Sequence, residues 1–448
     1  MEKKLSVRQI MVVASMLFGL LFGAGNLIFP VSMGQLAGAH MWQAVAGFVV
    51  TGVGVPILGV AALGISQENS VLELSGRVGR RYGIFFTCAL HLTVGPFFAI
   101  PRCATVSFTI GVAPVLSEGN HALALCLFSL AFFAVVLFLA LRPGEILTWV
   151  GKVLTPLFLV CLGILVLRAL TAPMGEISSI QPDQNYTAYP FFQGFLEGYN
   201  TMDALAGLAF GIIVINAIRG LGVARPGEIA KSTVKAGIFT ALLMTVIYVL
   251  MTAVGAQSRG VFQAAANGGD AFVLIADYYF GTAGILILAA TGTLACLKTA
   301  VGLVTSCSAI FVKIFPAGPS YRTWTLVFTI ASFAIANTGL NTIIAYSLPV
   351  LMFLYPLAVT LILLTLCGRF FGNDRVVYQW VTGCTAVAAG VDFLYTLPKE
   401  AADLLRVTGL TEAVREFLPL AELGFGWLCP AVLGLGIGMA LHWRRKER

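Results

Sequence analysis

Long blocks of apolar residues, separated by short polar segments, run through the whole 448-residue chain. A helix must present roughly 20 apolar residues to cross the hydrocarbon core of a membrane. The pattern therefore predicts an all-α integral membrane protein with about twelve transmembrane helices and no separate soluble domain. The predicted spans cover residues 9–31, 41–65, 83–113, 120–141, 148–170, 191–218, 231–257, 283–314, 323–338, 341–367, 377–397 and 419–442.

Composition supports a membrane protein and argues against a soluble one. Hydrophobic residues make up 58% of the chain and charged residues only 10%, too few to cover a soluble protein of this size. The nine cysteines all lie in apolar stretches without a CxxC pair, and the four histidines lie far apart. We therefore expect neither disulfides nor a zinc site. Lys3, Lys4 and Arg8 precede the first apolar run without a small-residue cleavage site after it, so we expect an uncleaved first span.

The distribution of positive charge predicts the topology. If the N-terminus is cytoplasmic, 20 of the 27 Lys and Arg residues fall in cytoplasmic segments and five in external loops. The other two, Arg102 and Lys298, fall inside spans. Because cytoplasmic loops carry the excess of Lys and Arg, this bias predicts that both termini are cytoplasmic. The net charge of +7 is then a feature of topology, and we expect a lipid bilayer as the partner and no nucleic acid.

Two spans are interrupted by polar and glycine residues. Span 1 contains Gly23-Ala24-Gly25-Asn26 in its middle, and span 6 contains Gly198-Tyr199-Asn200-Thr201-Met202-Asp203. Broken helices in matching positions of two halves indicate an inverted-repeat transporter with its binding site at the midplane. Half-helix N-termini there offer N–H groups to a carboxylate, and free carbonyls suit a cation or an ammonium group. A glycine packing seam in span 1 and a helix N-cap at Asp203 are the structural alternatives.

Span 8 contributes hard oxygen donors. Gly302, Thr305 and Ser306 are spaced i, i+3 and i+4 and therefore lie on one helix face. Two hydroxyls and a nearby carbonyl suit a small cation. Hydrogen bonding of these hydroxyls to the carbonyl four residues earlier is the alternative.

These and several further segments resemble the branched-chain amino acid transport system II carrier family, the bacterial leucine, isoleucine and valine symporters. The resemblance covers essentially the whole chain, and its motifs are long, irregular and in the right order. They are FGAGNLIFP at 22–30, GPFFAIPR at 95–102, ATVSF at 104–108, GYNTMD at 198–203, LACL at 294–297, TAVGL at 299–303 and LPLA at 418–421.

The resemblance implies a leucine-transporter-like fold within a single domain, 1–448. That fold has two inverted repeats of five spans, here 1–170 and 191–367, with spans 1 and 6 broken, and two peripheral spans at 377–442. In the wider fold the substrate carboxylate binds backbone N–H groups that correspond to Ala24 and Gly25. A sodium ion binds at positions that correspond to the carbonyls of Gly19, Phe22 and Gly302 and the hydroxyls of Thr305 and Ser306. Asn26 corresponds to a residue that helps to hold a different sodium ion in some members.

Two positions depart from the family pattern. Lys298 stands where an uncharged residue is usual, one turn before Gly302, and Thr109 stands where many relatives carry Glu. An ammonium group at Lys298 would compete with sodium or titrate with protons, so the coupling ion is either Na⁺ or H⁺. Pairing with an acid and snorkelling to the membrane surface are the alternatives for this lysine.

Charged residues within spans are functional candidates because they are costly in lipid. We expect Asp203 to orient the span 6 break or bind the substrate amine, together with Tyr199, Thr201 and Met202 as pocket residues. Arg102 is a coupling candidate like Lys298, and it would pair with Asp203 or with Glu197. For Asp392, outside the ten-span core, we expect a structural role. Phe97 and Phe98 are further candidates for the pocket wall.

The function that we expect is import of leucine, isoleucine and valine with Na⁺ or H⁺ by alternating access, in the bacterial cytoplasmic membrane. No covalent cofactor is expected. A membrane-embedded enzyme would need a cluster of His, Asp or Cys near one membrane face, and a channel would need a filter motif; neither occurs in the sequence. A symporter of the same fold for another apolar or small amino acid is the serious alternative.

Overall fold

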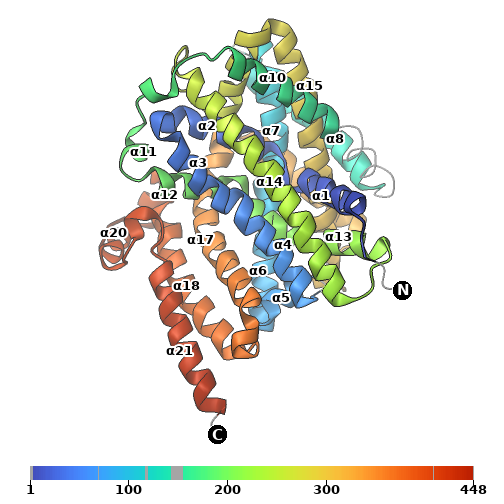
Figure 1. Ribbon diagram of the computed structural model, residues 1–448, viewed down its shortest axis with the longest axis vertical. Helices are drawn as coiled ribbons and strands as arrows, with labels where there is room; N and C mark the ends of the chain where they lie inside the picture. The colour runs from blue at the N-terminus through green and yellow to red at the C-terminus, as the bar shows by residue number, and fades with distance from the viewer. Residues whose placement is uncertain (1–3, 69, 117–119, 143–154, 407, 447–448) are drawn as a thin grey trace.

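In the computed structural model, which describes residues 4–68, 70–116, 120–142, 155–406 and 408–446, the described residues form helices and turns without a strand (Figure 1). The α-helices are α1 Val7–Leu21, α2 Ala24–Ala37, α3 Met41–Val49, α4 Val55–Ser66, α5 Val71–Gly76, α6 Arg80–Leu92, α7 Ala99–Gly111, α8 His121–Ala140, α10 Thr155–Thr171, α11 Gln184–Ala188, α12 Pro190–Glu197, α13 Asp203–Gly220, α14 Pro226–Ser258, α15 Gly268–Ile314, α16 Tyr321–Ala336, α17 Leu340–Leu366, α18 Arg375–Tyr395, α19 Lys399–Leu405, α20 Thr408–Phe417 and α21 Leu428–Lys446.

Several of these helices have the length and the apolar surface of membrane-spanning helices. Among the described residues, seven helical stretches are long and apolar enough to cross a membrane, or eight if α18 and α19, bent by 112°, form one span. Large apolar side chains point outward on α8 and α21, with Leu123 and Leu127 65% and 59% exposed and Val432 and Leu433 61% and 62% exposed. An apolar exterior is stable only in contact with lipid or another protein. The all-α membrane fold is as predicted, whereas the number of twelve spans stays a prediction.

The boundaries of the predicted spans differ in places. The span predicted at 283–314 begins earlier, because α15 starts at Gly268 and bends at Gly281, whose φ of 56° places it in the left-handed region. The span predicted at 83–113 is divided between α6 and α7 by a π-type turn at Thr93–Phe97, which contains Pro96. The first part of the span predicted at 148–170, up to residue 154, lies outside the described residues.

Glycines bring two pairs of helices into backbone contact. Where α2 crosses α14, a Cβ on Gly34 would lie 2.1 Å from the Thr252 carbonyl oxygen, and one on Gly255 would lie 2.2 Å from the Val31 carbonyl oxygen. Where α3 crosses α12, a Cβ on Gly47 would lie 1.9 Å from the Phe191 carbonyl oxygen, and one on Gly194 would lie 1.9 Å from the Ala44 carbonyl oxygen. Only glycine permits such an approach, as is common between membrane helices. These two seams hold α2 and α12, the helices that follow and precede the two interruptions.

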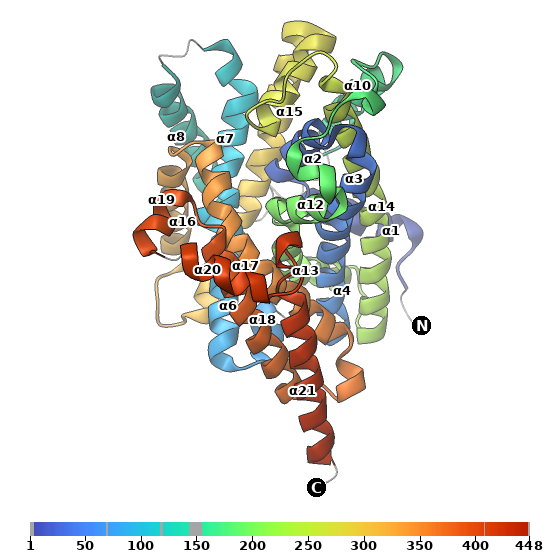
Figure 2. The same ribbon diagram turned by 90° about the vertical axis from the view of Figure 1, so that its left-hand side faces the viewer.

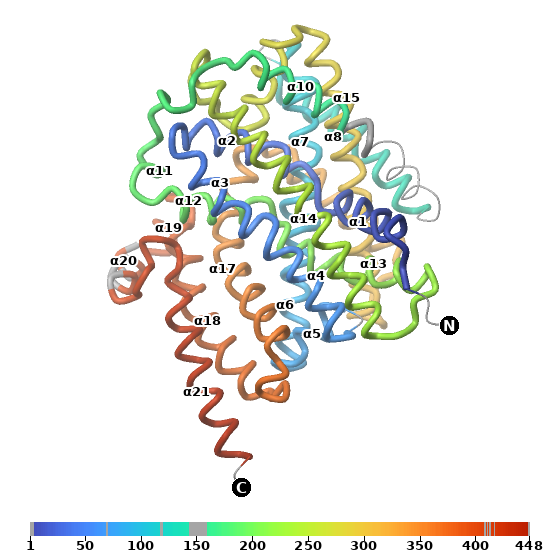
Figure 3. The backbone as a smooth tube through the Cα atoms, viewed as in Figure 1, coloured from blue at the N-terminus to red at the C-terminus, as the bar shows by residue number. Residues whose placement is uncertain are grey.

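The remaining helices form a frame around these elements. α7 packs along α15, α13 packs against α4, and α17 packs against α18. The tube in Figure 3 shows α1 and α2 as successive segments of one path, close to α14. In Figure 2, α18 and α21 lie together at the front of the molecule, and α21 carries the C-terminus well beyond the other helices.

Candidate functional site

The first span is broken between α1 and α2. α1 ends at Leu21, Phe22 and Gly23 have extended backbones, and α2 starts at Ala24. The Gly23 N–H donates to Asn26 Oδ1 at 2.8 Å, which turns the chain into the new helix. The N–H groups of Ala24 and Gly25 therefore lie in the first turn of a helix, where no intrahelical acceptor exists and the helix dipole is positive.

The sixth span is broken between α12 and α13. A 3₁₀ turn at Gly198–Thr201 follows α12, and Met202 has φ 63°, in the left-handed region. A side chain in this region costs about 1–3 kcal/mol and persists only where the surroundings enforce it. The Thr201 hydroxyl donates to the Gly198 carbonyl at 2.8 Å and accepts from the Asp203 N–H at 3.3 Å. The N-cap residue of α13 is Met202, without a side-chain cap, so the alternative of an N-cap at Asp203 is wrong and the Asp203 carboxylate is left for other contacts.

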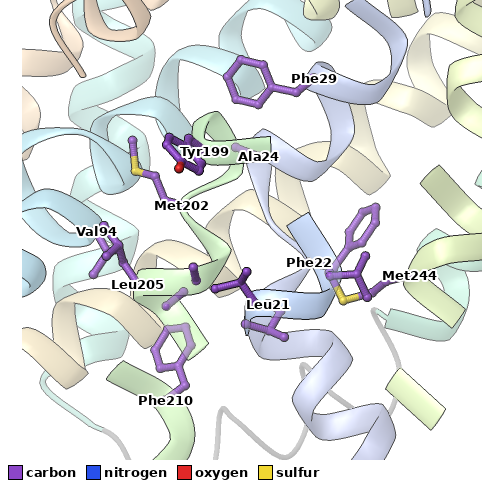
Figure 4. Close-up of a cluster of buried hydrophobic side chains, with 14 of the residues drawn as sticks. Leu21, Phe22, Ala24, Phe29, Val94, Tyr199, Met202, Leu205, Phe210 and Met244 are labelled. Atoms are coloured by element: carbon purple, nitrogen blue, oxygen red, sulfur yellow. The ribbon is translucent and has the colours of Figure 1, made fainter. Parts of the chain in front are cut away.

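The two breaks lie against each other. A Cβ on Gly25 would lie 3.3 Å from Thr201 Cα, and a Cβ on Gly23 would lie 3.0 Å from Thr299 Cγ2 of α15. Figure 4 shows Ala24 on the ribbon of α2 next to Tyr199 and Met202 on the interrupted ribbon of the sixth span. Even a methyl group at position 25 would therefore make a tight contact between the two interrupted segments, and a larger side chain would have to separate them.

A buried polar network joins the two breaks to α14. Asn26 Nδ2 donates to Asp203 Oδ2 and to the Tyr248 hydroxyl, and the Tyr248 hydroxyl donates to Asp203 Oδ2 at 3.2 Å. The three side chains are at most 2% exposed. Asp203 accordingly receives two donors from two other helices, as a buried carboxylate requires. Tyr248 was not a sequence candidate, although its hydroxyl inside the apolar stretch Val246–Met251 is a signal that could have found it.

Arg102 links α7 to three other elements. Its guanidinium donates to the Asn200 carbonyl at 2.6 Å and to the Ser347 hydroxyl of α17 at 3.1 Å, and it lies 5.0 Å from the ring centroid of Phe29. Among the ion pairs of the described residues, none joins it to Asp203 or Glu197, so a direct salt bridge with one of those acids is not formed, although Arg102 and Glu197 attract each other electrostatically. The reason is that the 3₁₀ turn of the sixth span leaves a backbone carbonyl free to accept from the arginine.

The breaks enclose a small cavity of about 30 Å³. Seven sequence candidates line it, namely Ala24, Gly25, Asn26, Arg102, Thr201, Met202 and Asp203. The apolar part of its wall was not foreseen, because such residues look like any others in an apolar span; it includes Val94, Cys103, Phe210 and Leu303. Figure 4 shows Val94 and Met202 on one side of the breaks and Phe210 below them.

Other candidates lie beside this cavity and do not line it. Tyr199 is fully buried and stacks on Tyr355 of α17, with ring centroids 4.1 Å apart. Phe97 is 43% exposed and neither it nor Phe98 lines the cavity. Asp392 of α18 is buried and lies 4.0 Å from Arg415 Nε, consistent with the structural role expected for it.

The span 8 candidates line a second, larger cavity. Gly302, Thr305 and Ser306 border a space of about 320 Å³, which also reaches Leu20 of α1 and Lys313 near the end of α15. Among the hydrogen bonds of the described residues, none involves the Thr305 or Ser306 hydroxyl, whereas the neighbouring Ser308 donates to the Val304 carbonyl at 2.7 Å. The alternative of back-bonding to the helix thus describes Ser308 and not the two candidates.

The remaining candidates of the cation site are only partly brought together. Gly19 and Phe22 are buried and do not line the second cavity. The Phe22 ring stacks on Phe18 at 5.0 Å and lies next to Met244 in Figure 4. Lys298 is partly buried on α15 and lines neither cavity.

Comparisons with known proteins agree with this geometry. The profile of a family described as branched-chain amino acid transport protein matches residues 6–445. The branched-chain amino acid permease BrnQ of Lactobacillus delbrueckii subsp. lactis is 49% identical over 434 residues, which are 97% of this chain and 96% of the relative.

Two solved structures share the fold at low sequence identity. Mhp1, a nucleobase-cation-symport-1 family transporter in a closed conformation with bromovinylhydantoin bound, has a TM-score of 0.61 at 14% identity, over 97% of this chain and 93% of that one. MhsT in complex with L-phenylalanine has a TM-score of 0.58 at 15% identity, over 92% and 100%. Both are transporters of the leucine-transporter fold, the fold predicted from the sequence.

Proposed function

Because the chain belongs to the branched-chain amino acid transport protein family, we propose that it imports leucine, isoleucine and valine together with a cation by alternating access. The family consists of permeases and not enzymes, and the chain is a multi-pass membrane protein. The observation that carries the finer proposal is the meeting of two helix breaks around a buried carboxylate.

Each group of an amino acid zwitterion has a complement at these breaks. The substrate carboxylate binds the N–H groups of Ala24 and Gly25, at the positive end of α2. The ammonium group binds Asp203, whose carboxylate borders the same cavity. The aliphatic side chain lies against the apolar wall formed by Val94, Met202 and Phe210. Since an apolar pocket separates side chains that differ by one methylene by only about 1–3 kcal/mol, we expect all three branched substrates to compete.

Alternating access is supported by the unequal size of the two cavities. The central cavity of about 30 Å³ has room for about two water molecules, too little for leucine, so the segments around the breaks must separate to admit substrate. The second cavity, of about 320 Å³, reaches the exposed residues Ala309 and Lys313. In our proposal it is the cytoplasmic exit, and α2 and α12 move relative to α7 and α15.

The two repeats, 1–170 and 191–367, remain part of the proposal. In an inverted repeat, span 1 corresponds to span 6 and span 2 to span 7. Because the order of the half-helices is kept in the two repeats, the packing of α2 on α14 then corresponds to the packing of α13 on α4, where a Cβ on Gly207 would lie 2.6 Å from the Pro56 carbonyl oxygen. This correspondence of contacts supports the division. The charge bias of the loops supports both termini being cytoplasmic in the cytoplasmic membrane.

Sodium is the coupling ion that we propose, bound by the hydroxyls of Thr305 and Ser306 and the carbonyls of Gly19, Phe22 and Gly302. Hydroxyls directed into a cavity and not at their own helix suit a hard cation. In this structure Gly302, Thr305 and Ser306 of α15 line a cavity that Gly19 and Phe22 do not reach. In our proposal the five ligands therefore come together only when α1 and α15 approach each other. A proton carried by Lys298 is the alternative.

Replacing Thr305 with alanine should raise the sodium concentration for half-maximal leucine uptake by about tenfold, the effect of losing one ligand worth roughly 1.4 kcal/mol. Ser308→Ala is the matched control, because the Ser308 hydroxyl donates to its own helix, accepts from Thr325 of α16 and does not border the cavity. The measurement is uptake into proteoliposomes at fixed leucine and varied sodium. Uptake that follows an imposed proton gradient and ignores sodium in both variants would refute the sodium site and make Lys298 the next residue to replace.

Replacing Arg102 with lysine should slow leucine uptake by about tenfold without changing the sodium concentration for half-maximal uptake. A lysine ammonium cannot serve the Asn200 carbonyl and the Ser347 hydroxyl with the geometry of a planar guanidinium. Ser347→Ala, which removes only one of these two contacts, should have a smaller effect. A changed sodium dependence in Arg102→Lys would instead assign Arg102 to coupling.

The transport assignment itself is tested by labelled leucine uptake under a sodium gradient with unlabelled competitors. Excess isoleucine and valine should each suppress the uptake by more than half, and alanine should not. Uptake that alanine suppresses equally would favour a symporter of the same fold for small amino acids.

A further inference from the structure

A groove of about 520 Å³ lies between the start of α6 and α18, away from both cavities described above. Figure 2 shows these two helices at the end of the molecule from which α21 projects. The groove is lined at its mouth by Arg80, Arg81 and Arg375 and further along α18 by Gly383 and Ala386. Its two ends therefore differ in chemistry, one strongly basic and the other formed by residues with small side chains.

The basic mouth is not neutralised by neighbouring acids. Arg80 and Arg81 are exposed, and their side chains make no hydrogen bond or ion pair within the described part of the chain. The nearest acids in the sequence each have another partner: Glu68 binds Arg77 at 3.1 Å, Glu73 binds Lys313 at 2.9 Å, and Asp374 binds His442 at 2.8 Å. An anion placed between the arginines would therefore meet uncompensated positive charge.

The third arginine is held in place. Arg375 Nε donates to the Val78 carbonyl at 3.1 Å, and Gln379 Nε2 donates to the same oxygen at 3.1 Å. These contacts join the first turns of α18 to the segment before α6, so the mouth has a defined shape. With Nε occupied, the Arg375 Nη groups remain to bind a ligand.

The length of the groove matches one leaflet of a membrane. From Arg375 to Ala386 an α-helix advances by about 16 Å, at 1.5 Å per residue, and the hydrocarbon core is about 30 Å thick. A Cβ on Gly383 would meet no atom within 4 Å, so open space adjoins α18 at this depth. Basic residues at the membrane surface above an apolar slot are the features that bind an anionic lipid.

We propose that this groove binds an anionic phospholipid, with its phosphate on Arg80, Arg81 and Arg375 and an acyl chain along Gly383 and Ala386. The loop count in the sequence assigns this end of the spans to the cytoplasmic leaflet. A bound lipid would join α6 and α18, and thus the third span to the peripheral spans. This inference rests on the membrane fold and not on the identity of the transported substrate.

The experiment uses the full-length protein in detergent, stripped of lipid, with lipid binding measured by native mass spectrometry. The probes are phosphatidylglycerol and phosphatidylcholine with the same acyl chains. Wild-type protein should bind phosphatidylglycerol preferentially. The Arg80→Gln, Arg81→Gln double variant should bind it about 30-fold more weakly, on the scale known for two basic residues at an anionic surface. The Arg444→Gln, Arg445→Gln double variant removes equal charge from the exposed end of α21 and should stay within about twofold of wild type.

A further variant separates a lipid from a free anion. Gly383→Phe fills the space beside α18 and leaves all three arginines, so it should weaken lipid binding, and inorganic phosphate should not compete. Equal losses in the two double arginine variants would show diffuse charge attraction and overturn the proposal. Unchanged binding by Gly383→Phe, together with competition by phosphate, would show an anion site and overturn the lipid assignment. A melting temperature close to that of wild type confirms that each variant is folded.

Discussion

Replacing Gly25 with leucine is expected to abolish leucine uptake, with a loss on the order of 100-fold or more, while the protein still reaches the membrane. A Cβ at this position would lie 3.3 Å from Thr201 Cα and from the Phe29 ring. A larger side chain must therefore push apart the two breaks whose N–H groups and carboxylate we assign to the substrate. A displacement of about 1 Å at such a site can cost 100-fold in rate.

Gly25→Ala and Gly436→Leu are the controls for this result. Alanine adds only the tight Cβ contact and should leave part of the uptake. Gly436 is exposed on α21 with no atom within 4 Å of its Cβ position, so leucine there tests the same change away from the site. The measurements are initial uptake into proteoliposomes and the melting temperature. Uptake by Gly25→Leu at the wild-type rate would show that the carboxylate does not bind at Ala24 and Gly25.

Replacing Asp203 with asparagine should raise the KM for leucine by roughly 100-fold, within the 2–5 kcal/mol lost when one partner of a buried charge pair is removed. Asparagine has nearly the same shape and keeps an oxygen that accepts from Asn26 and Tyr248. The variant therefore removes the charge and preserves the network that joins the two breaks. Kinetics over a wide range of leucine concentrations provide the measurement.

Tyr248→Phe is the matched control, since it removes a hydrogen bond to Asp203 Oδ2 but no charge. We expect its KM to rise by less than about tenfold, as for one hydrogen bond to a charged group. If Asp203→Asn transports leucine with the wild-type KM, the carboxylate serves only to hold α13 in place, and the ammonium group must bind elsewhere.

The interruptions themselves were predictable from the sequence because their cause is local. Glycine and asparagine lower helix propensity, and the structure has non-helical backbone at Gly23 and at Met202. The two interrupted spans, which supply most of the residues that line the central cavity, were therefore found without a structure. The start of α13 was not predictable, since Asp203 is a good cap by residue type, whereas the left-handed backbone of Met202 makes that residue the N-cap.

The partners of the charged residues depended on tertiary structure. The sequence offered Asp203 and Glu197 as partners of Arg102, but the arginine binds the Asn200 carbonyl and Ser347. A carbonyl becomes an acceptor only where the helix is broken, and which helix approaches it is a matter of packing. The same is true of Tyr248, which lies 45 residues from Asp203 in the chain.

By itself, the sequence determined that this protein lies in a membrane, that spans 1 and 6 are interrupted and which residues of spans 1, 6 and 8 carry polar groups. These properties follow from hydropathy, helix propensity and helical spacing, which act within a single segment. Only the tertiary structure decided that the span 8 hydroxyls border a separate cavity, that Asn26 and Tyr248 both bind Asp203, and that Arg102 binds a backbone carbonyl. These contacts join segments far apart in the chain, and close packing of the helices, with glycine at the seams, selects them.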